Sequence, residues 1–247
     1  MKKIFPVLLL VLILGSCKSK PQVTDTSASF AASGTGTFVA VDYDKLIEEY
    51  TKAIEQDPND ASLFAGRGNA YAAKGEYDKA IADYNEAVKL KPDDPVLYYN
   101  RGVAYDQKSD FDRAISDYTQ AIRLKADYTE AYNNRGAAYA DKKDYDRAIA
   151  DHTEAIKIKP DYTNAYNNRG YAYRNKGDLD KAIADYDDAV KLDPNNAVAY
   201  SNRGVAYFFK GDREKAITDY ETALRIDPNN AKAQNNLEAA RQQDGEQ

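Results

Sequence analysis

One segment, TNAYNNRGYAYRNKGDLDKAIADYDDAVKLDPNN (residues 163–196), contains a pattern that recurs through most of the chain. Its first half places Tyr166, Gly170 and Tyr173 at i, i+4 and i+7, which is one stripe of an amphipathic helix. A second stripe with helical spacing is formed by Leu179, Ala182, Tyr186, Ala189 and Val190. The segment therefore predicts two helices, and the absence of two-residue alternation predicts no sheet.

The residues between the two stripes predict a tight turn. Gly177 can take the left-handed conformation that commonly ends a helix, and Asp178 is well placed to cap the next one. Pro194 ends the second helix. Gly170 and Ala182 have almost no side chain, so the two backbones can approach closely while neighbouring tyrosines fill the space beside them. The unit is predicted to be a helical hairpin.

The same features return every 34 residues. Each copy has a glycine, a tyrosine three residues later and an alanine twelve residues later. The five glycines are Gly68, Gly102, Gly136, Gly170 and Gly204. Such a regular 34-residue spacing indicates one structural unit that is copied and stacked. Each unit then buries its apolar face against its neighbours.

This pattern of aromatic, glycine, tyrosine, alanine and proline positions resembles the tetratricopeptide repeat. Five full units fit the resemblance: residues 61–94, 95–128, 129–162, 163–196 and 197–230. The resemblance implies an all-α fold, a right-handed superhelix (α-solenoid) of antiparallel helix pairs. Five residues depart from the pattern. Ala126 stands at the proline position, and His152 stands at the position of the second-helix tyrosine. Ser109 and Lys143 replace the turn glycine, and Arg213 replaces an apolar residue. We expect local loosening there without a change of fold.

Partial units flank the five repeats. Residues 42–60 match the second half of a repeat and predict a lone N-terminal half-repeat helix. Residues 231–247 begin like another first helix and soon become polar. A C-terminal capping helix and tail are therefore expected, because a polar outer face keeps the end of such an array soluble.

The N-terminus carries the marks of an export signal. Lys2 and Lys3 precede an apolar run of 11 residues, Ile4 to Leu14. A span of the bilayer takes about 20 apolar residues, so the run is too short for a permanent membrane helix and predicts a cleaved signal peptide. Leu14-Gly15-Ser16-Cys17 resembles the lipobox of bacterial lipoproteins, in which the cysteine is acylated and becomes the first residue of the mature protein.

This resemblance assigns residues 1–16 to a lipoprotein signal peptide and residues 17–41 to the acylated Cys17 and a flexible tether rich in Ser, Thr, Ala and Gly. The alternative is a secreted protein with a chance cysteine at the cut. We expect a lipid-anchored protein of the bacterial cell envelope. Lys18 is not the acidic residue that some bacteria read as an inner-membrane signal, which slightly favours the outer membrane, at its periplasmic face or surface.

The repeat resemblance also implies a concave groove, lined by first helices, that holds an extended peptide or a partner helix. The candidate groove residues are Tyr99, Asn100, Asp106, Glu130, Asn134, Asn168, Tyr171, Arg174, Asn202 and Phe208. Asparagine recurs at one position, at residues 100, 134, 168, 202 and 236, which makes an amide ladder. Such a ladder can bond the backbone of a bound segment, or it can pack adjacent first helices.

One subfamily of this repeat, the clamp for chaperone tails, grips a C-terminal carboxylate with asparagines and cations. Asn69 and Asn100 match its asparagines, but its cationic positions are Ala65, Glu130 and Asn134 here. Without those positive charges a carboxylate has no electrostatic reason to bind. The clamp ligand is therefore rejected.

Other recurrent residues favour architecture over binding. Arginine before each glycine and an aspartate sixteen residues later predict ion pairs within or between repeats: Arg67, Arg101, Arg135, Arg169 and Arg203 with Asp83, Asp117, Asp151, Asp185 and Asp219. His152, the only histidine, is expected to be packed or hydrogen-bonded. Phe208 and Phe209 either pack under the C-terminal cap or form an apolar contact for a partner.

Charge and motifs limit the function classes. The formal charge is −6, and without residues 1–16 the chain keeps 32 basic and 40 acidic side chains, or −8, which disfavours nucleic acid. No phosphate loop, paired metal ligands or Ser/His/Asp arrangement appears, so no enzyme, metal or cofactor is expected. The leading interpretation is a membrane-anchored interaction scaffold with a protein or peptide partner. The alternative is a component that presents a small molecule or cell-wall fragment to a transporter or enzyme.

Overall fold

The computed structural model describes residues 41–242, and within this range the chain is all helical. The all-α prediction is therefore confirmed for the described residues, which contain no strand. The signal peptide, Cys17 and all but the last residue of the predicted tether lie outside them, as do residues 243–247 of the predicted C-terminal tail. None of the helices in residues 41–242 is both long enough and apolar enough to cross a membrane.

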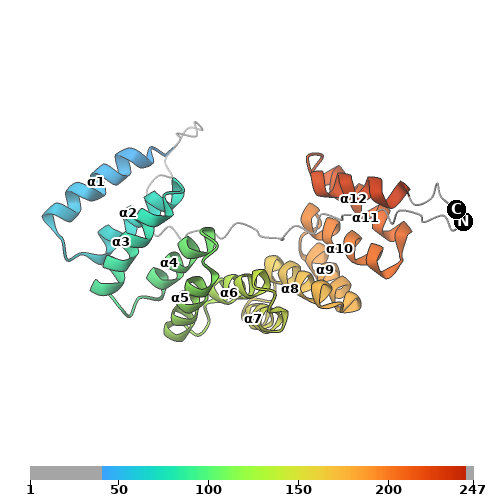
Figure 1. The fold of residues 1–247 in the computed structure, drawn as a ribbon, viewed down its shortest axis with the longest axis horizontal. Coiled ribbons are helices and arrows are strands. Elements are labelled where there is room, and N and C mark those ends of the chain that lie inside the picture. Colours follow the sequence, from blue (N-terminus) through green and yellow to red (C-terminus); the bar gives the residue numbers. More distant parts are fainter. Residues whose placement is uncertain (1–40, 243–247) are drawn as a thin grey trace, which may run out of the picture. The chain divides into compact units, whose positions relative to one another are not determined.

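The described chain forms two compact units. The N-terminal unit, residues 41–160, contains seven helices that contact one another in sequence order (Figure 1). Its first helices, α2, α4 and α6, also contact each other in succession. The helices are α1 (Tyr43–Gln56), α2 (Ala61–Ala73), α3 (Tyr77–Leu90), α4 (Pro95–Gln107), α5 (Phe111–Leu124), α6 (Thr129–Asp141) and α7 (Tyr145–Ile158).

The C-terminal unit, residues 161–242, repeats this arrangement (Figure 1). Its helices are α8 (Thr163–Lys176), α9 (Leu179–Leu192), α10 (Ala197–Lys210), α11 (Arg213–Ile226) and α12 (Ala231–Gln242). Each contacts the next, and α10 also contacts both α8 and α12. The first helices therefore lie next to one another in this unit too.

Aromatic rings packed over glycines hold each hairpin closed. A Cβ atom at Gly170 would lie 2.8 Å from Cε1 of Tyr186, and one at Gly136 would lie 2.8 Å from Cε1 of His152. These distances are too short for a real contact, so only glycine fits beneath the ring. His152 is fully buried in the ring position, which confirms that it is a packed residue.

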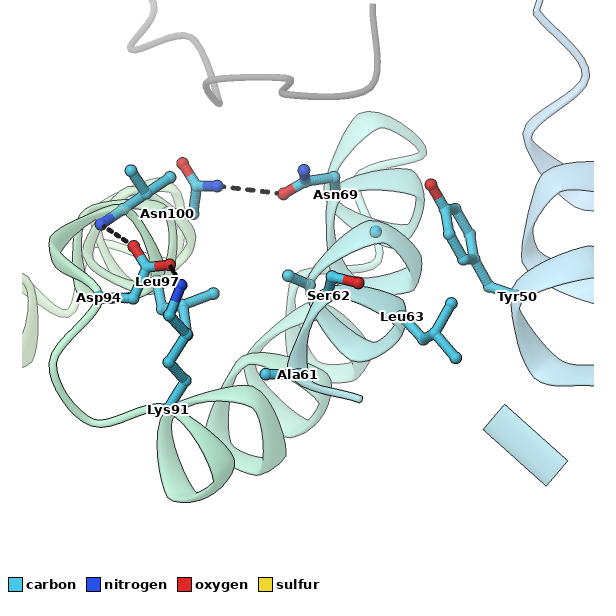
Figure 2. Close-up of a pocket in the computed structure, with 12 residues that line it drawn as sticks. Tyr50, Ala61, Ser62, Leu63, Asn69, Lys91, Asp94, Leu97 and Asn100 are labelled. Atoms are coloured by element: carbon cyan, nitrogen blue, oxygen red, sulfur yellow. Dashed lines mark hydrogen bonds and ion pairs between the residues drawn. The ribbon is translucent and has the colours of Figure 1, made fainter. Parts of the chain in front are cut away.

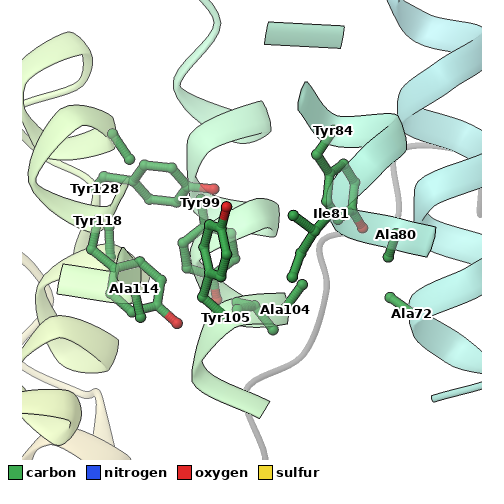
Figure 3. Packing of buried hydrophobic residues seen from close by; sticks show 13 residues of the cluster. Ala72, Ala80, Ile81, Tyr84, Tyr99, Ala104, Tyr105, Ala114, Tyr118 and Tyr128 are labelled. Atoms are coloured by element: carbon green, nitrogen blue, oxygen red, sulfur yellow. The ribbon is translucent and has the colours of Figure 1, made fainter. Parts of the chain in front are cut away.

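Figure 3 shows how the N-terminal unit fills the remaining space between its helices. Small alanines such as Ala80 and Ala114 are completely buried beside the larger rings. The ring of Tyr99 packs against Tyr128 at 5.0 Å and against Tyr118 at 5.9 Å between centroids. The core is thus a run of alanine and tyrosine contacts rather than one central cluster.

The turns inside the hairpins share one geometry although their residues differ. Gly177 has a φ of 94°, and the amide of Asp178 donates to the carbonyl of Tyr173 at 2.9 Å. Ser109 and Lys143 occupy the same turn position with φ of 59° and 63°. The following amides make the same 2.9 Å bonds, so the predicted loosening at these two residues is wrong. Because Ser109 and Lys143 stand where glycine is usual, these closed turns hold two non-glycine residues with strained, positive φ angles.

Helix capping agrees only in part with the sequence. Asp60 and Asp94 accept hydrogen bonds from the amides of Ser62 and Val96 at 2.8 and 3.0 Å. Asp178 is the N-cap residue of α9, but its side chain makes no capping bond, so that prediction is wrong. Its carboxylate lies 3.4 Å from the ammonium group of Lys181.

The arginine and aspartate of each repeat form the predicted ion pair. The Arg101 guanidinium donates to both carboxylate oxygens of Asp117, with its Nε at 2.8 Å and its Nη2 at 2.7 Å. Its remaining Nη1 donates at 2.8 Å to Asn85, on the second helix of the preceding repeat. The same fork recurs at Arg67, Arg135, Arg169 and Arg203. These arginines therefore join helices and set the stacking of the repeats.

Candidate partner-binding surface

The predicted groove residues lie on first helices in both compact units. The N-terminal unit holds Tyr99, Asn100 and Asp106 on α4, and Glu130 and Asn134 on α6. The C-terminal unit holds the other five: Asn168, Tyr171 and Arg174 on α8, and Asn202 and Phe208 on α10. Because the two sets belong to different units, each is described by itself.

In the N-terminal unit the amide ladder joins neighbouring first helices. Asn100 donates its side-chain N–H to the side-chain oxygen of Asn69 at 3.2 Å, and that oxygen also accepts from the Tyr84 hydroxyl at 2.8 Å. Asn134 donates at 3.0 Å to the Tyr99 hydroxyl. Both ladder residues thus take part in packing between α2, α4 and α6, which is the second of the two roles expected for the ladder.

The five candidate residues of the N-terminal unit differ in how much of each side chain is exposed. Tyr99 is 3% exposed and Asn100 is 2% exposed, and Asp106 is also buried. Glu130 and Asn134 are half-buried. Tyr99 contributes mainly to the core beneath the surface, whereas Glu130 has side-chain area that a partner can reach.

A pocket of about 290 Å³ opens beside the Asn69–Asn100 pair (Figure 2). Tyr50 of α1 faces it from one side, and Leu97 of α4 lies on the other. The loop from Lys91 to Asp94 also lines it, and these two side chains form an ion pair at 2.9 Å. The pocket is therefore lined by apolar side chains and by the amides of Asn69 and Asn100. The one cation in its lining, Lys91, is paired with Asp94.

The sequence did not single out Tyr50 or the Lys91–Asp94 loop as site residues. Tyr50 belongs to the half-repeat, which was interpreted only as an end helix. The pocket lies between α1, α2 and α4 and depends on how these three helices stack. The available signal was the amide at Asn69, which departs from the residues at the same repeat position, Val103, Ala137, Tyr171 and Val205.

The C-terminal unit presents a different chemistry, because it holds a buried cation without a carboxylate. Arg174 is only 7% exposed, and its guanidinium carbon lies 4.9 Å from the centre of the Tyr171 ring. Its Nη2 atom is buried and has no hydrogen-bond partner. By contrast, Arg169 and Arg203 of the same unit each bind both oxygens of an aspartate.

Two more buried hydrogen-bond donors of this unit lack a partner: the side-chain nitrogen of Asn202 and the hydroxyl of Tyr220. Burial raises the pKa of Tyr220, and the positive charge of Arg174 opposes that rise. The hydroxyl therefore stays protonated at neutral pH, and it lies within the electrostatic reach of the guanidinium. Arg174, Asn202 and Tyr220 come from α8, α10 and α11.

Phe208 and Phe209 behave differently from each other. Phe208 is partly buried and packs against a cluster that includes Val205 of α10 and Leu237 and Ala240 of the C-terminal helix α12. Phe209 is 50% exposed, and the two rings meet edge to face at 6.3 Å between centroids. The packing role expected under the cap thus holds for Phe208, while Phe209 remains available at the surface.

Within residues 41–242, no group of three or more His, Cys, Asp or Glu side chains is arranged to hold a metal ion. Asp117 and Asp151 are instead engaged in arginine forks, and Asp60 caps a helix. Among residues 41–242, Arg174 is the one buried cationic side chain.

Family models of the tetratricopeptide repeat match the chain along most of its described length. A model described as a TPR repeat matches residues 68–109 and 170–211. A second, described as a tetratricopeptide repeat, matches residues 95–128, 129–162 and 197–230, and a third with the same description matches residues 49–82 and 153–184. No curated protein matches the chain.

Several solved structures have a similar fold. YrrB, described as a TPR protein with an unusual peptide-binding site, is 27% identical over 79% of this chain and 99% of its own, with a TM-score of 0.63. MamA is 29% identical over 67% of this chain and 96% of its own, with a TM-score of 0.61. The C-terminal part of a TPR repeat-containing protein from Cytophaga hutchinsonii is 21% identical over 81% of each chain, with a TM-score of 0.67, and shows the fold alone.

Proposed function

Since the chain belongs to the tetratricopeptide repeat family, a family of protein-interaction scaffolds, we propose that it is a lipid-anchored scaffold of the bacterial cell envelope. On this proposal, its first helices bind an extended protein segment or a partner helix. Cys17 carries the lipid, and the repeats hold the partner near the membrane.

One observation carries the binding part of the proposal: the repeating charges are used inside the array, and three residues that depart from the repeat lie on first helices. The five arginine–aspartate forks are satisfied within the fold. Tyr171, Arg174 and Phe209 break the 34-residue pattern on α8 and α10. They are not part of the stacking pattern that every unit shares, which makes them candidates for contact with a partner. The similarity to YrrB, which is described as having a peptide-binding site, supports this role.

The anchoring part of the proposal is supported by the sequence of residues 1–17. Lys2 and Lys3, the apolar run and the lipobox-like Leu14-Gly15-Ser16-Cys17 fit a lipoprotein signal. A single acyl chain holds a protein to a membrane only weakly, whereas two or three chains anchor it stably. The outer membrane is the favoured location, because Lys18 stands where an acidic residue signals retention.

Fractionation tests the anchor. The full chain should sediment with membranes, and Cys17→Ser should move the protein out of the membrane fraction at equal expression. Ser16→Ala is the matched control, because it keeps a small residue before the cysteine, and it should stay membrane-bound. Unchanged sedimentation of Cys17→Ser would contradict lipid anchoring.

Affinity purification tests the scaffold. The full chain, extracted from envelopes in mild detergent, should recover the same protein partner reproducibly, while an unrelated lipoprotein extracted in parallel should not. A Tyr171→Ala, Phe209→Ala double variant should lose most of that partner, because both side chains extend from first helices. Recovery of no partner above the control level would count against the scaffold.

The pocket beside Asn69 favours a second candidate function, the capture of a small molecule for a transporter or enzyme. Its volume of about 290 Å³ falls near the lower end of the range for ligand sites. On this alternative, a soluble ligand raises the melting temperature of the protein, and Asn69→Ala removes the effect. The scaffold predicts no such stabilisation, and its partner should survive Asn69→Ala.

A further inference from the structure

From the uncovered face of α1, we infer that residues 27–39 dock on this helix and complete a sixth repeat. With the same face, every other second helix of the described chain contacts the first helix of its own repeat. Residues 27–39 lie outside the described residues and are identified by the 34-residue register. Docking adds one first helix to the surface of the proposed scaffold, and it needs no partner in order to occur.

The helix α1 lacks the cover that the other second helices have. Tyr84 and Ala87 of α3 are completely buried. Their counterparts on α1, Tyr50 and Ala53, are only half-buried, and no residue of α1 is buried. The helix stands at the end of the N-terminal unit and packs against α2 of the next repeat (Figure 1). The apolar stripe that would contact a first helix of its own repeat is therefore open.

The ring of Tyr50 shows which contact is missing. In a complete hairpin, such as that of Tyr118, the ring lies over the glycine of its own repeat, Gly102. The Tyr50 ring instead lies against Gly66 of the next repeat, where a Cβ atom would collide with it. Since Tyr50 is half-buried, its ring still has area for the glycine of a first helix.

The sequence before α1 supplies the residues that this contact needs. Gly34 stands 34 residues before Gly68, the glycine beneath the Tyr84 ring. Phe30 stands 34 residues before Phe64, at the aromatic position of the first helix. The register thus places a glycine opposite the Tyr50 ring, in a segment that leads directly into α1.

The junction with α1 keeps only part of the hairpin geometry. Asp42 accepts a hydrogen bond from an amide in the first turn of α1, as Asp110 does in α5. Val41, however, stands at the turn position of Gly75 and does not have a positive φ. A β-branched residue bears strain in that conformation. Residues 27–39 therefore dock more weakly than the first helices of the other hairpins.

A second copy of the chain fits the open face less well. Among the described helices, α12 is the one first helix without a second helix of its own, so it is the other candidate. Glu238 stands on α12 at the glycine position, 34 residues after Gly204. Its side chain would meet the Tyr50 ring at a place where only glycine fits. The segment that precedes α1 is thus the better occupant.

Docking changes both the binding surface and the distance to the membrane. First helices of the N-terminal unit contact each other in succession, so the docked segment would lie beside α2. Only residues 18–26 would then remain between Cys17 and the docked helix. As a random coil these residues span about 15–18 Å, against about 25–30 Å for residues 18–41. The docked state holds the repeats nearer the membrane.

Hydrogen exchange of the purified full chain in detergent micelles, measured by mass spectrometry, tests the inference. Residues 27–39 and α1 should both exchange faster in Gly34→Leu, by about 5-fold or more, because leucine would collide with the Tyr50 ring. Leucine is a better helix former than glycine, so a helix that formed without docking would exchange more slowly in this variant. Faster exchange is therefore specific to docking.

Ala28→Leu is the matched control, because its position corresponds to Ser62 and Val198, which are both exposed. It should exchange like the parent. Val41→Gly should slow the exchange of residues 27–39 by about 3–10-fold, because glycine takes the left-handed turn conformation without the strain of other residues. Val41→Ala, which keeps a Cβ atom in the turn, should not slow it.

Exchange of residues 27–39 that is equal in the parent and Gly34→Leu, or slower in Gly34→Leu, would overturn the inference. Protection of α1 that rises with protein concentration, without protection of residues 27–39, would assign the open face to a second copy and would also overturn it. The purified protein holds no partner, so the affinity purification remains a separate test of the scaffold.

Discussion

At the scale of single residues, the repeat works through close contacts that leave little room for change. The ring of the second helix touches the glycine of the first, so one methyl group separates a good fit from a clash. The sequence predicted a close approach of the backbones at Gly170 with tyrosines filling the space beside it, and the Tyr186 ring does lie against that glycine. The isolation of Arg174 could not be predicted in that way, since it depends on which neighbouring groups fail to reach it.

Gly170→Leu should lower the free energy of unfolding by about 1–3 kcal/mol, because its side chain would have to displace the Tyr186 ring. Chemical unfolding followed by circular dichroism measures the change. Ala184→Leu, on the exposed face of α9 in the same hairpin, is the control and should change stability by less than about 0.5 kcal/mol. Equal effects at the two positions would contradict the packing described here.

Ser109→Gly and Lys143→Gly should each stabilise the protein by about 1 kcal/mol, because glycine adopts a positive φ without the strain that other residues bear. Thermal unfolding gives the measurement. Lys142→Gly is the comparison, since Lys142 has a φ of −77° and gains nothing from glycine. If neither turn variant were more stable than the parent, the strain assigned to these turns would be absent.

At the scale of helices and repeats, the arginine–aspartate fork defines how one element meets the next. Burial raises the pKa of Asp117, while the Arg101 guanidinium bound to both of its oxygens holds it down. The two effects oppose each other, so the pair contributes geometry more than stability. The sequence predicted this pair from its spacing, but the third bond of Arg101 to Asn85 became evident only once the helices were placed.

Asp117→Ala alone should cost about 3–5 kcal/mol, because it leaves a buried guanidinium unpaired. Arg101→Met combined with Asp117→Leu should cost far less, or nothing, since both charges are removed together. The difference between the two in urea unfolding measures how much of the loss is the unpaired charge. A double variant as unstable as the single one would show that the fork supplies net stability.

At the scale of the whole molecule, the repeat fold followed from the sequence while the binding chemistry did not. The helical hairpins and the fold class come from a local pattern that is copied five times, and each copy reinforces the same interpretation. The pocket beside Asn69 and the open donors near Arg174 come from differences between copies, which acquire meaning only when neighbouring helices are in place. Asp178 shows the same limit locally, because it stands at the expected N-cap position of α9 and yet makes no capping bond.

Site-specific crosslinking in living cells tests the central claim, that first helices bind a protein partner, most directly. A photoreactive amino acid at Tyr171, on the first helix α8, is compared with the same amino acid at Ala184, exposed on the second helix α9. The full lipidated chain should give a reproducible protein adduct from position 171 that is weak or absent from position 184. Equal adduct patterns from the two positions, or none from 171, would contradict the claim.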